Sequence, residues 1–315
     1  MTLAIVGTGT DVGKTVVAAT LLARYGAEIP LAYWKPVATG SRDGRDTATV
    51  EALAGDRAAI LPESCLFVEP LSPHLAARLE GRRIEPAALL ADFDRHRAMG
   101  RTLVIETAGG LLVPLVDGEG DRGGEDQGEG ETHGHDRGGW PFRLPPPGSA
   151  VPAVTGTAGT APSGAPSGGT AAACYLQADL LVDMARRAPL ACLVVARSGL
   201  GTINHTLLTL EALRMRGLAL AGVVLDGPPN RENRLAIQRF GGVDAIFELP
   251  YLAPLDREEV AAATRHFDPQ GHLAPLLRLR RHPTGSGSRA GDGSEGRIET
   301  GRGGRSRRTL PRPTT

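Results

Sequence analysis

The sequence lacks several features that mark large classes of proteins. It holds no run of about 18 or more apolar residues, so a transmembrane helix is not expected. Its N-terminus shows no charged segment followed by an apolar stretch and a small-residue cleavage site, so a signal peptide is not expected either. The 35 basic and 35 acidic residues give a net charge of zero, which is a poor match to general nucleic-acid binding.

Cysteine is scarce, and its spacing does not suit a structural metal. Cys65, Cys174 and Cys192 are odd in number and form no CxxC pair. This pattern argues against a disulfide framework and against a zinc site. It favours reduced thiols and therefore a cytoplasmic protein.

Lysine is nearly absent. Of the 35 basic residues only Lys14 and Lys35 are lysines, and all the others are arginines. An ammonium group is a compact point charge, whereas a guanidinium group is a planar fork. Chance is one explanation, and the other is that these two positions need a cation where the fork does not fit.

What the sequence has in excess is glycine (42 residues) and proline (24 residues), and both concentrate in two stretches of its 315 residues. Residues 117–173 are rich in glycine, proline and acidic residues, and we predict a disordered insertion there. Residues 281–315 predict a disordered basic tail, with contact to an acidic partner as the alternative. The remaining residues, 1–116 and 174–280, are expected to form a single domain.

In that remainder, strand-like and helix-like segments alternate, which predicts βαβ units, a mostly parallel sheet and a doubly wound α/β fold. Continuously apolar strands indicate that helices cover both faces of the sheet. The expected strands are 3–7, 31–35, 64–68, 102–106, 190–196, 220–225 and 245–249. The expected helices are 13–25, 46–54, 176–187, 204–216, 230–239 and 256–264, with two more within 72–81 and 85–99.

The first strand leads into the glycine-rich segment Gly7–Thr15, whose sequence is GTGTDVGKT. Its glycines let backbone amides approach phosphate oxygens, and the following helix adds positive potential at its N-terminus. Lys14 is expected to reach the β- and γ-phosphates, and the Thr15 hydroxyl to bind Mg²⁺. Five residues separate Gly7 from Gly13, where the general P-loop motif has four. The order strand, loop and helix nevertheless predicts a P-loop NTPase fold.

Three further polar residues follow predicted strands. Lys35 ends the second strand and Glu106 ends the apolar run 102–105, so both are expected at the ligand-binding edge of the sheet. The two lysines are therefore predicted to meet at one anionic site. Glu106 beside the phosphate loop suits a Mg²⁺ ligand. Asp46 could supply another oxygen, or it could simply cap the helix that it begins.

Several motifs occur together in a fixed order: Gly7–Thr15, KPVATG at 35–40, EPLSPH at 69–74, ETAGG at 106–110 and GTINH at 201–205. This ordered set resembles the dethiobiotin synthetases of biotin synthesis, over about residues 1–265. The resemblance implies a homodimeric, cytoplasmic ligase that closes the ureido ring of dethiobiotin. Its substrates are implied to be 7,8-diaminopelargonate, CO₂ and MgATP, with a carbamate and a carbamic–phosphoric anhydride as intermediates.

The resemblance also assigns roles to residues of this sequence. Lys14 and Lys35 are implied to be catalytic, by neutralising the phosphates and the carbamate. Thr15, Asp46 and Glu106 are implied to hold Mg²⁺. Thr39 and Asn204 are implied to bind the substrate, with Asn204 reaching across the dimer to its carboxylate. The implied nucleotide-binding residues are Gly9, Thr10, Asp11, Val12, Gly13, Lys14, Thr15, Asp226, Pro250, Tyr251 and Leu252.

Two residues depart from the pattern of that family. Thr107 stands where glycine is common, and it is expected to crowd the substrate. Asp226 stands where an asparagine commonly reads adenine. A carboxylate only accepts hydrogen bonds, whereas an amide both donates and accepts. This difference raises the hypothesis of relaxed nucleotide choice with some use of GTP.

Three other functions remain as alternatives. A partition-type or cluster-carrier switch ATPase commonly has an additional lysine near the start of the loop, which Gly7-Thr8-Gly9 lacks. A cobyrinate-amidating enzyme needs a glutaminase domain with a cysteine nucleophile, for which the predicted tail offers no room. A non-enzymatic scaffold would require the insertion for function, whereas an enzyme core should tolerate its deletion.

Overall fold

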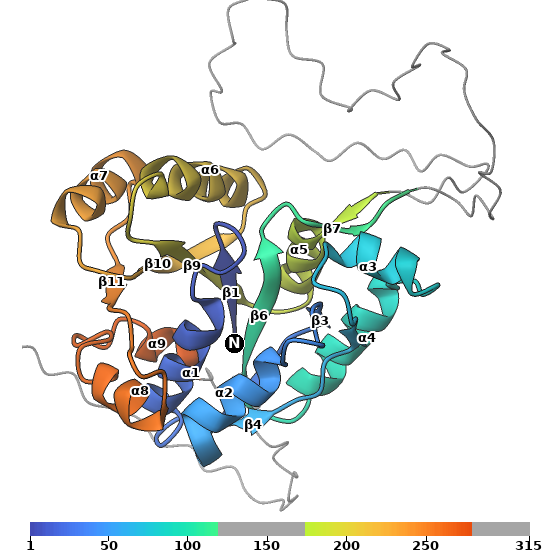
Figure 1. Cartoon of the computed structure of the whole chain (residues 1–315), viewed down its shortest axis with the longest axis horizontal. Coiled ribbons are helices and arrows are strands. Elements are labelled where there is room, and N and C mark those ends of the chain that lie inside the picture. Colours follow the sequence, from blue (N-terminus) through green and yellow to red (C-terminus); the bar gives the residue numbers. More distant parts are fainter. Residues whose placement is uncertain (119–173, 279–315) are drawn as a thin grey trace, which may run out of the picture. The chain divides into compact units, whose positions relative to one another are not determined.

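Apolar runs of the sequence become the strands of one central sheet in the computed structural model, which describes residues 1–118 and 174–278. Each neighbouring pair of its seven strands is parallel (Figure 1). From one edge to the other the strands are β11 (Ile246–Leu249), β10 (Ala219–Asp226), β9 (Leu190–Arg197), β1 (Thr2–Gly7), β6 (Thr102–Gly110), β2 (Leu31–Trp34) and β4 (Ala59–Ile60). The predicted doubly wound α/β fold is confirmed.

Helices pack on both faces of the sheet because successive side chains of a buried strand point to opposite sides. In β1, Leu3 and Ile5 join one apolar cluster, and Ala4 and Val6 join the other. The first cluster is covered by α1 (Lys14–Tyr25), α2 (Asp46–Ala54), α8 (Arg257–Ala263) and α9 (Ala274–Leu277). The second is covered by α3 (Pro73–Leu79), α4 (Pro86–Arg97), α5 (Gln177–Arg187), α6 (Thr202–Met215) and α7 (Arg231–Gly241).

The order of the strands locates the ligand-binding edge. The chain leaves β1 at Gly7, and the strands on its two sides are β9 and β6. In open α/β sheets a crevice opens at the carboxyl ends of strands where connections leave in opposite directions. The order of the strands therefore predicts the site at the carboxyl ends of β1, β6 and β9.

Short elements were not foreseen from the sequence, because two or three residues carry no usable periodicity. The predicted strand 64–68 shrinks to β5 (Cys65–Leu66), and it pairs with β3 (Val37–Ala38) instead of entering the central sheet. The strand at that edge of the central sheet, next to β2, is β4, which was not predicted. The short helices η1 (Gly55–Arg57) and α9 were not predicted either.

The two described ends of the predicted insertion lie side by side. Val116 of β7 (Pro114–Val116) pairs with Tyr175 of β8 (Tyr175–Leu176) in an antiparallel ladder. The insertion predicted at 117–173, apart from its first two residues, and the tail predicted at 281–315 lie outside the described residues. Within the described residues, no helix is long and apolar enough to cross a membrane.

Candidate active site

The phosphate-loop segment folds tightly between β1 and α1. Gly13 adopts a φ of +91°, a left-handed conformation that suits glycine. A Cβ at Gly7 would lie 2.6 Å from the carbonyl oxygen of Gly9 and 2.9 Å from Nζ of Lys14, so only glycine fits there. No side chain caps the N-terminus of α1, which leaves its first amides available to an anion.

Lys14 is buried at the start of α1, with an exposed fraction of 7%. Its Nζ donates a hydrogen bond of 3.0 Å to the carbonyl oxygen of Gly9, so the side chain folds back over the loop. Burial lowers the pKa of Lys14, and the nearby Lys35 lowers it further, while Glu106 opposes the shift. A negatively charged ligand bound in the loop would stabilise the charged form of this buried ammonium group.

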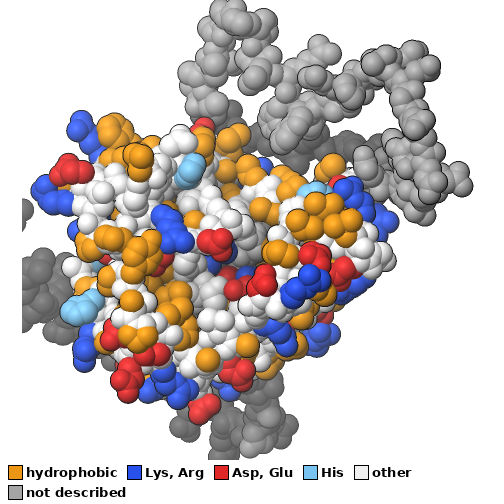
Figure 2. Space-filling model, in the orientation of Figure 1, with side chains coloured by type: hydrophobic (Ala, Val, Ile, Leu, Met, Phe, Trp, Pro, Cys, Tyr) orange, Lys and Arg blue, Asp and Glu red, His pale blue; other side chains and the backbone are white. Residues whose placement is uncertain are grey.

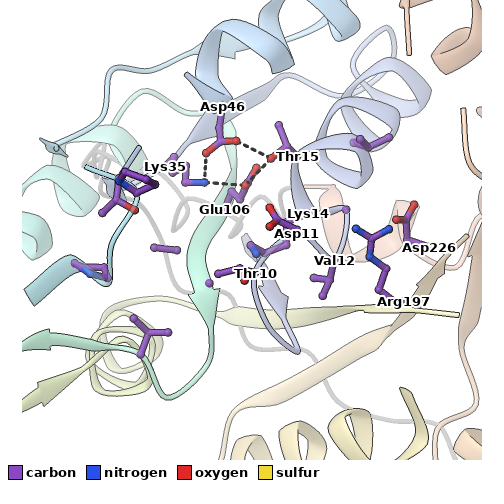
Figure 3. A pocket seen from close by; sticks show the side chains of 18 of the residues that line it. Thr10, Asp11, Val12, Lys14, Thr15, Lys35, Asp46, Glu106, Arg197 and Asp226 are labelled. Atoms are coloured by element: carbon purple, nitrogen blue, oxygen red, sulfur yellow. Dashed lines mark hydrogen bonds and ion pairs between the residues drawn. The ribbon is translucent and has the colours of Figure 1, made fainter. Parts of the chain in front are cut away.

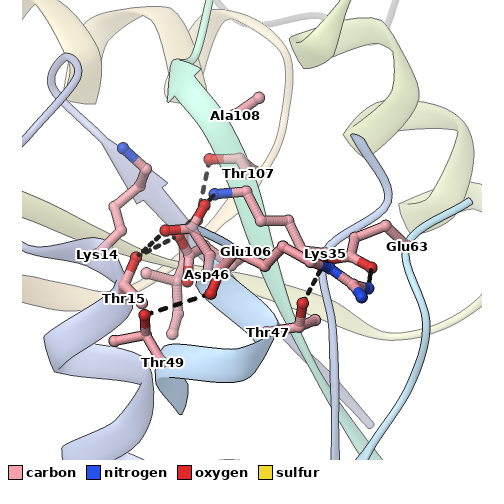
Figure 4. A network of polar contacts seen from close by, with 12 residues as sticks. Lys14, Thr15, Lys35, Asp46, Thr47, Thr49, Glu63, Glu106, Thr107 and Ala108 are labelled. Atoms are coloured by element: carbon pink, nitrogen blue, oxygen red, sulfur yellow. Dashed lines mark hydrogen bonds and ion pairs between the residues drawn. The ribbon is translucent and has the colours of Figure 1, made fainter. Parts of the chain in front are cut away.

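A second cluster joins Lys35, Asp46, Glu106 and Thr15 (Figure 4). The Lys35 ammonium donates to Asp46 and, over 3.0 Å, to Oε1 of Glu106. The Thr15 hydroxyl lies 3.0 Å from Oδ1 of Asp46 and 2.9 Å from Oε1 of Glu106. The N-cap of α2 is Arg45, so Asp46, the first residue of the helix, does not hold the cap position that the alternative interpretation gave it.

The cluster is held by burial and by charge. Glu106 is fully buried, and its Oε2 accepts a 2.8 Å hydrogen bond from the Tyr33 hydroxyl. Burial alone would lower the pKa of Lys35, but the carboxylates of Glu106 and Asp46 raise it, so the ammonium group stays charged. Burial would raise the pKa of Asp46, and Lys35 holds it below its usual range. Both carboxylates are thus paired with a lysine inside the protein.

The same cluster offers ligands for a divalent cation. The two carboxylates and the Thr15 hydroxyl are hard oxygen donors whose oxygens converge within hydrogen-bond distance of one another. Among the residues that the structure describes, no group of three His, Cys, Asp or Glu side chains forms a closed metal site. A small number of protein ligands is enough for Mg²⁺, because this ion keeps several waters and also binds substrate phosphates. The donor set therefore fits a magnesium ion shared with a nucleotide.

Both lysines line one cleft of about 720 Å³ at the carboxyl edge of the sheet. Figure 2 shows the face that carries it, hollowed near its centre, with acidic and basic side chains around the hollow. This volume suits a nucleotide-sized ligand. The expected residues on its wall, most of them labelled in Figure 3, are Thr10, Asp11, Val12, Gly13, Lys14, Thr15, Lys35, Thr39, Asp46, Glu106, Asp226, Tyr251 and Leu252.

Other expected residues lie elsewhere. Gly9 contacts Lys14 but is not on the wall of the cleft, and neither is Pro250. Asn204 is exposed on α6 and does not reach the cleft of its own chain. Thr107 does not line the cleft, and that it crowds the substrate stays a prediction. Its buried hydroxyl donates to the carbonyl oxygen of Ile5, 3.0 Å away.

Sequence reasoning missed several residues of the wall. Arg197 follows the predicted strand 190–196, so its place at the carboxyl edge was readable from the same rule that located Lys35. The segment 70–73 also lines the cleft, a role that its sequence motif does not predict. Leu255 carried no signal, because its loop has no regular pattern.

Comparison with known proteins gives consistent matches. A family model described as an AAA domain matches residues 1–120 and 167–259. The chain is 35% identical to the ATP-dependent dethiobiotin synthetase of Paramagnetospirillum magneticum, over 82% of this chain and 91% of the relative. It is 36% identical to that of Agrobacterium fabrum, over 87% of this chain and 95% of the relative. A ParA family ATPase structure from Chlorobium tepidum shares only 9% identity, with a TM-score of 0.41, over 88% of this chain and 96% of that one.

Proposed function

This chain belongs to the family of ATP-dependent dethiobiotin synthetases, and from that premise we propose how its cleft performs the ligase reaction. ATP and 7,8-diaminopelargonate are the proposed substrates, with CO₂ as the source of the new carbon. The single observation that carries the proposal is that the only two lysines of the chain line one cleft. A phosphoryl transfer to a carbamate gathers negative charge at one place, and two point cations there suit it.

The proposed reaction has three steps that balance. One amine of the substrate attacks CO₂ and loses a proton, which forms a carbamate. A carbamate oxygen then attacks the γ-phosphorus of ATP, and ADP leaves. Finally the second amine attacks the carbamate carbonyl, the bond to the phosphate oxygen breaks, and phosphate and a proton leave as the ureido ring closes.

The residues of the cleft have separate tasks in this scheme. The amides of Gly9–Thr15 and the ammonium of Lys14 hold the phosphates at the N-terminus of α1. Lys35 is held at the opposite wall by Glu106 and Asp46, and it faces the position of the carbamate. Its charge stabilises the two anions as they approach each other.

Thr15, Asp46 and Glu106 are the proposed ligands of Mg²⁺. When bound, the ion neutralises oxygens of the nucleotide phosphates. The residues of this chain hold the ligand oxygens in place, since Tyr33 fixes Glu106 and Lys35 fixes Asp46. Such supporting contacts commonly change metal affinity by about 10–100-fold.

A homodimer is the proposed assembly, because Asn204 is expected to bind the substrate carboxylate and does not reach its own cleft. Asn204 lies near two exposed apolar side chains, Leu200 with its side chain fully exposed and Leu208 with 56% exposed. A second copy that covered this surface would bury apolar area and bring Asn204 toward another cleft.

We also propose a cytoplasmic location. All three cysteines of the chain are free. Cys192 is buried, and burial raises the pKa of its thiol to about 12. Reduced thiols of this kind persist in a reducing compartment.

Phosphate release tests the proposed function. The full chain, ATP and Mg²⁺ are incubated with diaminopelargonate and bicarbonate together, and then with each one omitted. Release that needs both, with one phosphate for each dethiobiotin formed, is the expected result. Steady hydrolysis of ATP without the diamine would instead indicate a switch ATPase and would overturn the proposal.

A further inference from the structure

One buried carboxylate of the cleft lies outside the cluster of Lys35, Asp46, Glu106 and Thr15. Asp226 ends β10, lines the cleft and has an exposed fraction of only 6%. A Cβ at Gly13 would lie 2.5 Å from its Oδ2, so the carboxylate sits directly against the phosphate loop. Within the described part of the chain its side chain accepts no hydrogen bond. A buried acceptor of this kind is costly unless a ligand supplies the donor.

A cation stands beside this acceptor. Arg197 ends the neighbouring strand β9 and lines the same wall of the cleft, and Figure 3 shows its guanidinium group next to the Asp226 carboxylate. Its Nη1 donates a 2.7 Å hydrogen bond to the Tyr251 hydroxyl, and its Cζ lies 5.7 Å from the centre of the Tyr251 ring. These contacts hold the guanidinium group in place, and among residues 1–118 and 174–278 its other nitrogens donate to no second partner.

Tyr251 in turn rests on Gly227, the residue that follows Asp226. A Cβ at Gly227 would lie 3.4 Å from Cζ of the tyrosine ring and 2.8 Å from Oγ of Ser198. Gly227 also has a φ of +123°, which other residues rarely adopt. The acceptor, the cation and the aromatic ring thus form one unit at the end of the cleft away from Lys35.

We propose that Asp226 and Arg197 read the base of the nucleotide together, and that this pair accepts guanine as well as adenine, so that GTP also supports the reaction. The proposal rests on the proposed function, because it names a second nucleotide for the same site. It makes Asp226 a specificity-determining residue, and Tyr251 the residue that positions Arg197.

Base chemistry explains why guanine fits this pair. Guanine presents the N1–H and N2–H donors side by side, and next to them the O6 acceptor. A carboxylate can accept from both donors, and an adjacent guanidinium can donate to O6. Adenine presents one amino group next to a ring nitrogen that accepts. The carboxylate can therefore accept one hydrogen bond from the amino group, and the guanidinium can donate one to the ring nitrogen. Guanine therefore gains a contact that adenine lacks.

The carboxylate has the charge that this role requires. Burial raises the pKa of Asp226 to about 6, while Arg197 opposes the shift. At pH 7.5 the side chain is thus mainly ionised and accepts two N–H groups without donating. Charge-assisted hydrogen bonds of this type are stronger than those between neutral groups.

The test compares dethiobiotin formation with ATP, GTP and ITP at pH 7.5. ITP keeps the O6 and N1–H of GTP but lacks the 2-amino group. We expect GTP to support turnover within about tenfold of ATP, and ITP to give a kcat/KM about tenfold or more below that of GTP. This comparison uses the unaltered chain, so it does not depend on the folding of any variant.

Substitution then assigns the effect to one residue. Asp226→Asn should lower kcat/KM for GTP far more than kcat/KM for ATP, whereas the same exchange at the exposed Asp244 should change neither. Failure of GTP to support turnover while ATP does, or equal turnover with GTP and ITP, overturns the inference. If no nucleotide yields dethiobiotin, the proposed function fails. The inference is then decided by direct binding, where GDP weaker than ADP by more than about tenfold contradicts it.

Discussion

Nζ of Lys35 lies 3.0 Å from Oε1 of Glu106, and this contact joins the end of β2 to the middle of β6 beneath the cleft. Both side chains are nearly inaccessible to solvent. Lys35 also pairs with Asp46 of α2, so one ammonium group ties together three elements of the structure. The enclosure explains why a lysine stands here in a chain whose basic residues, apart from Lys14 and Lys35, are arginines.

Lys35→Arg should therefore fail although it keeps the charge. A guanidinium group is larger and planar, and it cannot fill a buried space built for an ammonium group between two carboxylates. We expect kcat to fall by about 100-fold or more, a loss similar to that caused by removing one donor to a reacting anion. Steady-state kinetics measures kcat of Lys35→Arg, with Arg95→Lys as a control at an exposed position. Full turnover by Lys35→Arg would show that the shape of the cation is unimportant.

Thr15→Val should weaken the response to magnesium. The exchange keeps the size of the side chain and removes the hydroxyl that lies between Asp46 and Glu106. We expect the Mg²⁺ concentration for half-maximal activity to rise about tenfold or more, as for other lost metal contacts. Thr15→Ser keeps the hydroxyl and should behave nearly as the unaltered chain. An identical Mg²⁺ response of all three proteins would contradict the assignment of Thr15.

The long elements were predicted well from the sequence, because long helices have a periodic apolar pattern and buried strands have continuous apolar runs. β1, β6, β9 and β10 each contain a continuous apolar run, and Asp46–Ala54 was predicted with its observed bounds. Pairs such as β3 with β5 escaped because contacts distant in sequence, not local pattern, create them. In the site, strand position alone placed Lys35 at the carboxyl edge, whereas β6 continues past Glu106 to Gly110. Tyr33 beneath Glu106 was missed, because an aromatic residue in an apolar run gives no sign that its hydroxyl has a partner.

The pH dependence of stability tests whether Asp226 is an unpaired buried acid. Its pKa rises from 3.8 to about 6 in the folded protein, so the folded state binds the proton more tightly than the unfolded state. The ionised side chain thus destabilises the fold above pH 6, and that cost disappears as the pH falls through 6 towards 4. Asp226→Asn should raise the free energy of unfolding at pH 7.5 by about 1–2 kcal/mol.

Urea unfolding without nucleotide at pH 7.5 and pH 5 measures this effect. The increase in the free energy of unfolding caused by Asp226→Asn should be smaller at pH 5, because the aspartate is then mostly protonated in the folded state. An equal effect of Asp226→Asn at both pH values would mean that burial of charge is not its cause.

Tyr25→Phe should destabilise the protein without affecting the cleft. The Tyr25 hydroxyl donates to the buried carboxylate of Asp268, which also accepts from the backbone amides of His272 and Leu273. This contact fastens the segment before α9 to α1. Loss of a buried hydrogen bond to a charged group should lower the free energy of unfolding by about 1.5–3 kcal/mol. Urea unfolding gives the value, and unchanged stability together with unchanged KM for ATP would show that the contact contributes nothing.

Mixing two inactive variants tests the role of Asn204 across a dimer. Lys35→Ala and Asn204→Ala should each lose most of their activity alone. Mixed dimers hold one site with both substitutions and one intact site. Random exchange of subunits should therefore restore about a quarter of the original activity, given two-fold symmetry. No recovery after subunit exchange, shown by mass of the mixed dimer, would place Asn204 outside the partner's site.

Incorporation of labelled bicarbonate into dethiobiotin is the decisive test of the proposed ligase reaction. The full chain is incubated with 7,8-diaminopelargonate, MgATP and carbon-labelled bicarbonate, and the product is identified by mass spectrometry. We expect labelled dethiobiotin from the unaltered chain and from an Arg95→Ala control, and almost none from Lys14→Ala or Lys35→Ala. Equal labelled product from either lysine variant would contradict the assignment of the cleft, and no labelled product from the unaltered chain would contradict the activity itself.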